Sequence, residues 1–175
     1  MFDTSYPYVK KTHRMYQEGE YECCRHVFTF RDYRNEVFIV HVEEYPEMVY
    51  AIKFYQKSHR DSENKWCLKT NAGDAHKKIG TCYRIMMDEF FAHNPFASFA
   101  FHAVPNVGVK SLESTQRHRI YRLVMSNLFN SGSNFWHVEV PKSSCYLLAN
   151  KSHQDQEWYD RVKAMFTSIY PDISI

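Results

Sequence analysis

The chain has 175 residues, a length typical of one domain, and 44% of them are hydrophobic. A globule of this size buries roughly 70% of the surface that its unfolded chain exposes, so it needs no disulfide or structural metal for stability. The formal net charge of +2 is too small to indicate the concentrated basic surface of nucleic-acid-binding proteins. We therefore expect one domain over residues 1–175 and regard nucleic acid as an unfavoured partner.

The cysteine pattern favours a reducing compartment. The five cysteines have no repeated spacing, which argues against a disulfide framework and against a Cys-x-x-Cys zinc or redox site. The N-terminal residues lack the apolar core of a signal peptide, and no stretch approaches the roughly 20 apolar residues of a membrane span. We expect a soluble cytoplasmic protein with no membrane partner and with reduced, mostly buried thiols, namely Cys23, Cys24, Cys67, Cys82 and Cys145.

The first half of the chain reads as an antiparallel meander. Residues 1–20 are polar with a few aromatics, and we expect an N-terminal arm there that packs through Tyr6, Tyr8 and Tyr16. Three period-2 runs rich in β-branched and aromatic residues then predict strands. Their links are short enough for hairpin-like connections. These strands cover residues 24–32, 36–44 and 48–57, and "KWCLKT" (65–70) is a candidate fourth strand.

The second half alternates helices with strands. A buried stripe predicts a helix from Asp74 to "HNP", and a second helix capped by Ser114 follows a buried strand at residues 96–104. Two strands at 135–141 and 145–150 and a helix from Asp155 to Tyr170 complete the chain. The stripes consist of Ile79, Cys82, Tyr83, Met86 and Phe90, then Ile120, Leu123, Val124 and Leu128, and finally Trp158, Val162, Met165, Phe166 and Ile169.

This order predicts the α+β class. A strand–helix–strand unit within a mostly antiparallel meander implies a single mixed, mostly antiparallel sheet with helices on its faces. No repeat or linker divides the chain.

The same order, with "STQRHRIYRLVMSNLF" (114–129), resembles the GNAT N-acyltransferases over roughly residues 21–150. In that family a meander leads to a central helix, a strand, a second helix and a closing strand. Ile120-Tyr121 stands where the family has its "LY" motif. The resemblance implies an acyl-CoA cofactor and gives Tyr121 the role of the tyrosine that protonates the departing CoA thiolate.

The resemblance also implies a phosphate-binding loop at the start of the central helix, where backbone N–H groups hold the CoA pyrophosphate. The corresponding stretch, residues 70–78, has one glycine instead of a pair, and Asp74 brings a negative charge. Asp74 as a helix N-cap is the simpler interpretation. The candidate cofactor-binding residues are Asn71, Ala72, Gly73, Lys77 and Lys78.

The chain further resembles an uncharacterised bacterial family of small α+β proteins. The resemblance lies in "AIKFYQKSH", "TNAGDAHKKIGTCYRIMMDEFFAHNP" and "RHRIYRLVMSN". No activity follows from it, so it supports the layout alone.

Three arginines of the second predicted helix are candidate anion-binding residues: Arg117, Arg119 and Arg122, with His118 beside them. They span more than one turn, so a solvated face is the simpler interpretation. Tyr121 likewise has a structural alternative, as a packed tyrosine with a hydrogen-bonded hydroxyl.

Other chemistry is less favoured by the spacing of residues. His26 and His41 lie on neighbouring predicted strands and would face each other, but no metal-binding motif appears, and we expect no metal. A Cys–His nucleophile would pair Cys82 with His102 or His137, although Cys82 belongs to a buried stripe. The basic, aromatic connection at 56–75 could contact single-stranded nucleic acid, or could be a solvated loop that carries Lys57, His59, Arg60, Lys65, Trp66 and Lys69.

Three hypotheses about function remain. The first is a GNAT-like binding or interaction module without a well-formed acyl-CoA site and with no cofactor, whose partner is unknown and is either another protein or a second copy of the chain. The second is an active N-acyltransferase that uses acetyl-CoA or another acyl-CoA, with Tyr121 as general acid. The third is a nucleic-acid-associated accessory protein.

Overall fold

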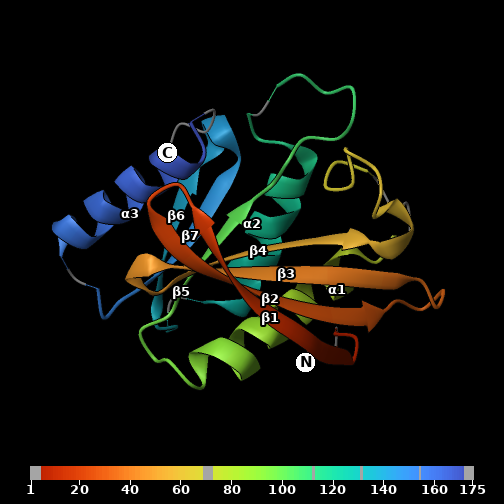
Figure 1. The fold of residues 1–175 in the computed structure, drawn as a ribbon, viewed down its shortest axis with the longest axis horizontal. Coiled ribbons are helices and arrows are strands. Elements are labelled where there is room, and N and C mark those ends of the chain that lie inside the picture. Colours follow the sequence, from red (N-terminus) through yellow and green to blue (C-terminus); the bar gives the residue numbers. More distant parts are fainter. Residues whose placement is uncertain (1–4, 69–72, 112, 131, 154, 172–175) are drawn as a thin grey trace.

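The computed structural model describes residues 5–68, 73–111, 113–130, 132–153 and 155–171. One mixed sheet of seven strands runs through them in the order β1-β2-β3-β4-β5-β7-β6. Helices cover both faces of this sheet (Figure 1). The predicted α+β class, with a mostly antiparallel sheet, is confirmed.

The first four strands form the predicted antiparallel meander. The predicted N-terminal arm is a full edge strand, Tyr8–Glu18, paired with β2, and Tyr6, Tyr8 and Tyr16 pack on the two core clusters as expected. Most of its side chains are exposed, so backbone hydrogen bonds hold it and no buried face marks it in the sequence. The strands are β1 (Tyr8–Glu18), β2 (Tyr21–Arg31), β3 (Val37–Tyr45) and β4 (Val49–Gln56).

The remaining three strands extend the sheet beyond β4. β5 (Ser98–His102) lies parallel to β4, and β7 (Cys145–Asn150) lies antiparallel between β5 and β6 (Phe135–Val140). The predicted strand over 65–70 was wrong where it is described, since residues 63–67 form turns and 69–70 lie outside the described residues.

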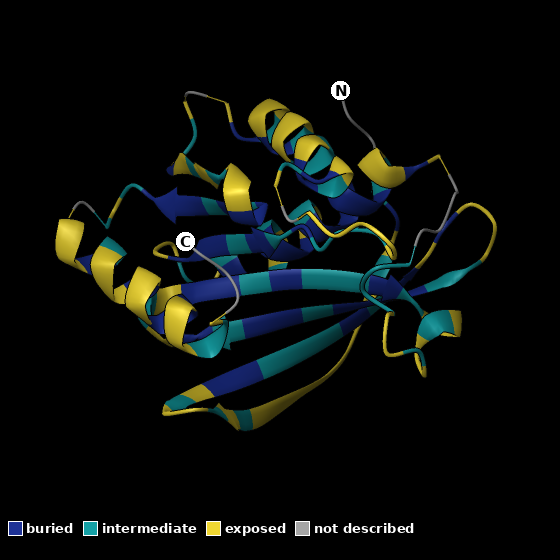
Figure 2. Cartoon of the chain, turned by 90° about the horizontal axis from the view of Figure 1, so that it is seen from above, coloured by how far each residue is buried: buried dark blue, intermediate teal, exposed yellow. Residues whose placement is uncertain are grey.

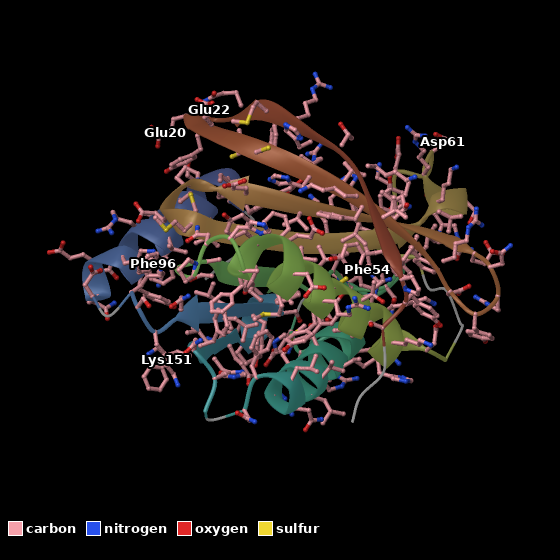
Figure 3. The ribbon with its side chains drawn as sticks, turned by 90° about the horizontal axis from the view of Figure 1, so that it is seen from below. Glu20, Glu22, Phe54, Asp61, Phe96 and Lys151 are labelled. Atoms are coloured by element: carbon pink, nitrogen blue, oxygen red, sulfur yellow. The ribbon has the colours of Figure 1, made fainter. Side chains whose placement is uncertain are left out.

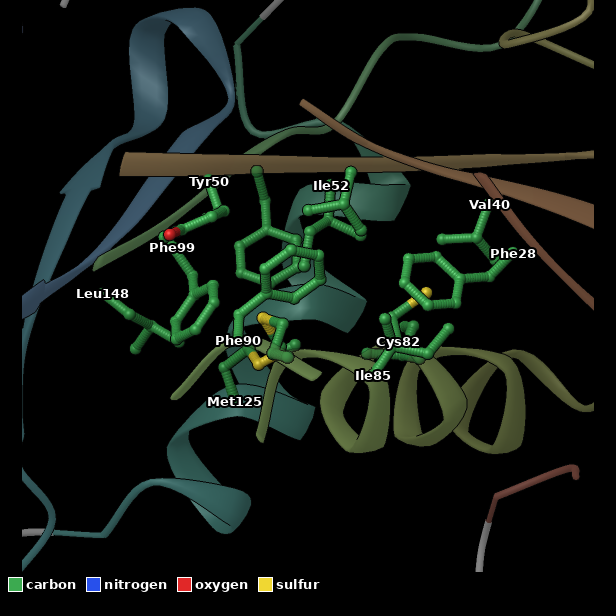
Figure 4. Packing of buried hydrophobic residues seen from close by; sticks show 14 of the residues in the cluster. Phe28, Val40, Tyr50, Ile52, Cys82, Ile85, Phe90, Phe99, Met125 and Leu148 are labelled. Carbon is green, nitrogen blue, oxygen red and sulfur yellow. The ribbon is translucent and has the colours of Figure 1, made fainter. Parts of the chain in front are cut away.

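Two helices pack on one face of the sheet. α1 (Ala75–Ile85) continues as a π-helical segment (Met86–Phe91), and α2 (Gln116–Leu128) lies beside it. Figure 4 shows their side chains meeting those of the strands. The fully buried members of this cluster include Phe28, Phe38, Val40, Ile85, Met86, Phe99, Met125 and Leu148.

The third helix, α3 (Gln156–Ile169), covers the opposite face. Asp155 caps it by accepting a hydrogen bond from the N–H of Trp158. The inward side of the helix is buried and its outer side is exposed (Figure 2). Its predicted stripe is confirmed for the four residues that are buried, Trp158, Val162, Met165 and Phe166.

Two details of α2 differ from the sequence prediction. Thr115, not Ser114, is the N-cap, because its Oγ1 accepts from the N–H of His118 at 3.2 Å, whereas Ser114 has a positive φ of 43°. The predicted stripe is confirmed in part, because Ile120, Val124 and Leu128 pack on the core. Leu123 is 64% exposed, while Met125 is completely buried. Leu123 and Met125 are both hydrophobic, so the sequence is compatible with either one facing the core.

Of the helices in the described residues, none combines the length and the apolar character that crossing a bilayer requires.

The rotation of α2 can be tested with two alanine substitutions. Met125→Ala should lower the free energy of unfolding by about 2–5 kcal/mol, because it opens a cavity in the core. Leu123→Ala, the matched control, should change it by no more than about 0.5 kcal/mol. Urea unfolding measures both, and equal losses would contradict the orientation of α2.

Candidate functional site: the cleft between β4 and β5

The two parallel strands at the centre of the sheet pair over a short distance only. Val49, Tyr50 and Ala51 of β4 lie opposite Ser98, Phe99 and Ala100 of β5, and the paired register ends there. β4 continues to Gln56 beside β3, and β5 continues beside β7, so the two strands diverge (Figure 1). We call the space that opens beyond this point the β4–β5 cleft.

A cavity lies on each side of the diverging strands. The α3-side cavity, of about 270 Å³, is lined by strand residues and by Tyr159, Val162 and Phe166 of α3. The α1-side cavity, of about 370 Å³, is lined by the first residues of α1 and α2. Both cavities share three lining residues, Phe54, Arg117 and Tyr121. These three side chains therefore stand between the two cavities.

The wall of the α3-side cavity is mostly apolar. Its aromatic surface comes from Trp66, Phe101 and Phe166, and Val138 and Val140 of β6 extend it. Trp66 packs edge-on against Tyr55 and His41, with ring centroids 4.7 and 5.5 Å away. A ligand with a compact hydrocarbon or aromatic body fits such a wall.

Glu43 is the buried carboxylate of this cavity, with a residue exposure of 2%. Its Oε1 lies 3.0 Å from Arg25 and 2.9 Å from Lys53, and Tyr45 donates to Oε2 at 2.9 Å. Burial alone would raise the pKa of Glu43, but Lys53, Tyr45 and Arg25 lower it below its ordinary value. The carboxylate is thus ionised and already neutralised by its neighbours.

Arg117 supplies a charge that no carboxylate of the described residues neutralises through an ion pair. Its half-buried guanidinium donates to the carbonyl oxygens of Trp66 and of Leu68, the latter at 2.9 Å. These bonds fasten the 56–75 connection to α2. They also leave a net positive charge where the two cavities meet.

Tyr121 lies beside Arg117 at the junction of the cavities. Its ring packs against Phe101 at a centroid distance of 5.8 Å. Burial raises the pKa of Tyr121 to about 12, so the hydroxyl is protonated at neutral pH. Within the part of the chain that the structure describes, this hydroxyl has no hydrogen-bond partner, and it can therefore donate to a ligand.

The start of α1 holds a buried network of charges. Asp74 receives hydrogen bonds from Lys78 Nζ at 2.5 Å and from the Tyr6 hydroxyl at 2.7 Å. Lys78, which is 2% exposed, also lies 3.4 Å from Asp32. Asp74 occupies the N-cap position, but its side chain makes no capping hydrogen bond because Lys78 and Tyr6 hold it.

This network determines which groups of the predicted phosphate-binding loop are available to bind a phosphate. Lys78 is fully committed to carboxylates, and Lys77 lies over the Tyr6 ring, 4.5 Å from its centroid. Gly73 is exposed, with a φ of 71°. Asn71 and Ala72 lie outside the described residues. A carboxylate at the start of the helix opposes the binding of an anion there.

The structure does not bring the three arginines of α2 together. Arg119 donates to the Ser114 carbonyl oxygen at 2.6 Å, and Arg122 extends to within 4.0 Å of Glu139. Both are exposed, whereas His118, which precedes Arg119, is 3% exposed and faces the core. Arg117 alone reaches the cleft.

The other histidine and cysteine candidates are also separated. His26 and His41 do not face each other, because His26 lies opposite Val42 and His41 opposite Val27, which puts the rings on opposite faces of the sheet. Cys82 is buried, and burial raises the pKa of its thiol to about 12. A thiol of this kind is a poor nucleophile.

His102 and His137, the two proposed partners of Cys82, have different surroundings. His102 lines the α3-side cavity, and burial lowers its pKa. His137 contacts the Tyr146 hydroxyl and the Phe129 carbonyl oxygen.

The connection at 56–75 is partly folded onto the sheet. Trp66 is engaged with aromatic rings, and Lys65 lies 5.6 Å over the Trp66 ring. Figure 3 shows Asp61 at the periphery of the molecule, and Lys57 and Arg60 are exposed as well. Lys69 lies outside the described residues. The tryptophan face needed to stack on a base is thus already covered in part.

Sequence reasoning missed Glu43, Lys53 and the role of Trp66 in this site. Glu43 stands in "VEE" at the end of a strand, where a pair of glutamates usually indicates exposure. An alternation argument assigns Glu43 to the face of Ile39 and His41, but it does not reveal that α3 covers that face. Trp66 could have been suspected, since a lone tryptophan in a polar connection often packs on a neighbouring element.

Replacing Lys78 tests the network at the start of α1. Lys78→Met leaves two buried carboxylates without their shared cation, so we expect about 3–5 kcal/mol less free energy of unfolding at pH 7. Burial alone would raise the pKa of Asp74, but the hydrogen bonds from Lys78 and Tyr6 lower it. The stabilisation from Asp74 is therefore present above pH about 4 and lost as the pH falls further.

In the variant the sign reverses for Asp74, because burial then outweighs its remaining hydrogen bond from Tyr6 and raises its pKa above that of the unfolded chain. Lys78→Met should then gain stability between pH 7 and pH 5, as urea unfolding at both values would measure. Lys77→Met is the matched control and should lose at most about 1 kcal/mol. Similar losses in the two variants would contradict the network.

Comparisons with known proteins give no match, so the geometry of the site is the basis for the proposed function. No family model, no curated protein and no solved structure matches the chain.

Proposed function

We propose that this chain is a GNAT-like α+β protein that binds a small anionic ligand with an apolar body in the β4–β5 cleft and does not transfer acyl groups. One observation carries the proposal. The strands separate after Ala51 and Ala100, and Arg117 and Tyr121 line the cavities on both sides.

The order of elements supports the GNAT-like part of the proposal. A meander, a central helix, a strand parallel to β4, a second helix and two closing strands follow one another along the chain. β4 and β5 are the parallel neighbours in this sheet, and they enclose the site. A crevice between separating parallel strands is a common place for ligands in sheets of this kind.

The charges of the cleft favour an anion. Glu43 is compensated by Lys53 and Arg25, so its charge does not offset that of Arg117. Lys163 of α3 adds a further cation to the rim of the α3-side cavity. A guanidinium binds a carboxylate through two parallel hydrogen bonds, and the Tyr121 hydroxyl offers a third donor. The aromatic and aliphatic wall would take the rest of the ligand.

The start of α1 argues against a CoA pyrophosphate. The phosphate groups would meet the carboxylate of Asp74, and Lys78 is already bound to Asp74 and Asp32. The helix N-terminus attracts anions when its N–H groups are free and no negative charge stands beside them. For this reason we place binding without acyl transfer ahead of catalysis.

An N-acyltransferase remains the second candidate because of Tyr121. Its protonated hydroxyl lies at the junction of the two cavities, where the GNAT resemblance expects the group that protonates a departing thiolate. This candidate requires an acyl-CoA that enters from the α1 side despite Asp74.

Decanoate, decanol and decyltrimethylammonium form a matched set of probes for the cleft. Decanoate should raise the melting temperature in a saturable way, because a ligand that binds only the native state must stabilise it. Arg117→Gln should weaken decanoate binding by about 10-fold or more, which corresponds to a lost charge-assisted hydrogen bond. Tyr121→Phe should weaken it less.

Arg122→Gln is the control, since Arg122 lies on the same helix and is exposed. Its binding should equal that of the wild type, and circular dichroism should show that all variants are folded. Equal stabilisation by the three probes, or equal effects of the two arginine variants, would contradict the anion-binding cleft.

Acetyl-CoA separates the two candidate functions. At millimolar concentration it should leave the melting temperature unchanged if the chain only binds small anions. A saturable rise, together with acetylation of an amine that Tyr121→Phe slows at least about 100-fold, would establish the acyltransferase instead.

A further inference from the structure

A group of three metal-binding side chains lies on the sheet, away from the cleft. Cys24 and His26 are two residues apart on β2, so they point to the same face. Glu44 of β3 is the direct cross-strand partner of Cys24. A thiol, an imidazole and a carboxylate are therefore held side by side by the register of two paired strands.

The distances suit a metal ion. One ligand atom from each of the three residues lies within 4.8 Å of the others. Tetrahedral zinc places its ligand atoms roughly 3.3–3.7 Å apart, given metal–ligand bonds of about 2.0–2.3 Å. Small rotations of the side chains close this difference, and the backbone need not move.

The surroundings fix two of these side chains. Phe90 packs edge-on against the His26 ring, with centroids 5.1 Å apart, and His26 Nε2 lies 2.8 Å from Glu44 Oε2. Tyr50 donates to the other carboxylate oxygen at 3.2 Å. Hydrogen bonds of this kind orient ligands in metal sites. Burial differs, since Cys24 is 8% exposed whereas the Glu44 side chain is 41% exposed.

The two ring nitrogens of His26 differ in their surroundings. His26 Nδ1 is buried and has no hydrogen-bond partner among the described residues. An unsatisfied buried polar atom of this kind costs about 1–3 kcal/mol. Because Glu44 lies at Nε2, an ion shared by His26 and Glu44 would bind through that nitrogen.

We propose that Cys24, His26 and Glu44 bind one zinc ion. Thiolate and imidazole ligands favour Zn²⁺ over Mg²⁺ or Ca²⁺, which prefer oxygen. His13 of β1 lies opposite His26, with ring centroids 6.0 Å apart, and is a candidate for the fourth ligand.

This zinc site is independent of the β4–β5 cleft. Glu44 follows Glu43 of the α3-side cavity in the chain, but adjacent strand residues point to opposite faces of the sheet, and the linings of both cavities lack Cys24, His26 and Glu44. Failure of either proposal therefore leaves the other untouched.

Cobalt provides the probe, because Co²⁺ replaces zinc and a thiolate ligand gives it a strong near-ultraviolet charge-transfer band. The full chain, reduced and freed of metal by a chelator, should bind one Co²⁺ with this band and with the intense visible bands of a four-coordinate ion. Zn²⁺ should displace the cobalt. Cys24→Ser should remove the charge-transfer band, and Glu44→Gln and His26→Gln should weaken binding by about 10-fold or more.

Cys23→Ser is the matched control. Cys23 is the neighbouring residue, is 1% exposed and belongs to the cluster on the opposite face of the sheet. Its variant should bind Co²⁺ like the wild type, and thermal unfolding should confirm that every variant is folded. Absence of the band in the wild type, its persistence in Cys24→Ser, or equal loss in the two cysteine variants would overturn the proposal.

Discussion

The short parallel pairing of β4 with β5 is the constraint on which the candidate site depends. The strands share a register over only three residue pairs, ending at Ala51 and Ala100. Beyond these residues, β4 remains paired with β3 and β5 remains paired with β7. The two halves of the sheet therefore separate at one end of the β4–β5 pairing. Helices on both faces of the sheet cover the gap, and side chains from α2 extend into it. The cleft follows from strand pairing and would persist through many changes of side chain.

Two buried charge networks, one on each side of the sheet, decide what this cleft can hold. On the α3 side, Glu43 is neutralised by Arg25 and Lys53 and is ionised without attracting a further cation. On the α1 side, Lys78 neutralises Asp74 and Asp32. Arg117 between them donates to two carbonyl oxygens, pairs with no carboxylate of the described residues, and keeps its charge. The excess of positive charge at the junction follows from this arrangement.

The elements with a strong hydrophobic period could be predicted from the sequence, and those without one could not. The strands around Phe28, Val40 and Ile52 are rich in buried apolar residues, and α3 has one buried side with helical spacing. β1 has no such signal, since its side chains are mostly exposed and its hydrogen bonds involve the backbone. For α2, Leu123 and Met125 offer competing stripes, and only packing against the sheet selects Met125.

The site was predicted only in part, because its chemistry depends on contacts between distant segments. Tyr121 and the 70–78 stretch could be named from their place in the order of elements. The hydrogen bond from Tyr6 to Asp74 joins residues 68 positions apart, and no local sequence pattern indicates it. The group formed by Cys24, His26 and Glu44 depends in the same way on the register between β2 and β3.

A crystal structure of the protein with a bromine-labelled decanoate tests the central claim most directly. The anomalous signal of bromine should lie in the α3-side cavity, with the carboxylate bound by Arg117 and Tyr121 and with β4 and β5 separated beyond Ala51 and Ala100. A cleft closed by side chains, or bromine found elsewhere while the cleft stays empty, would contradict it.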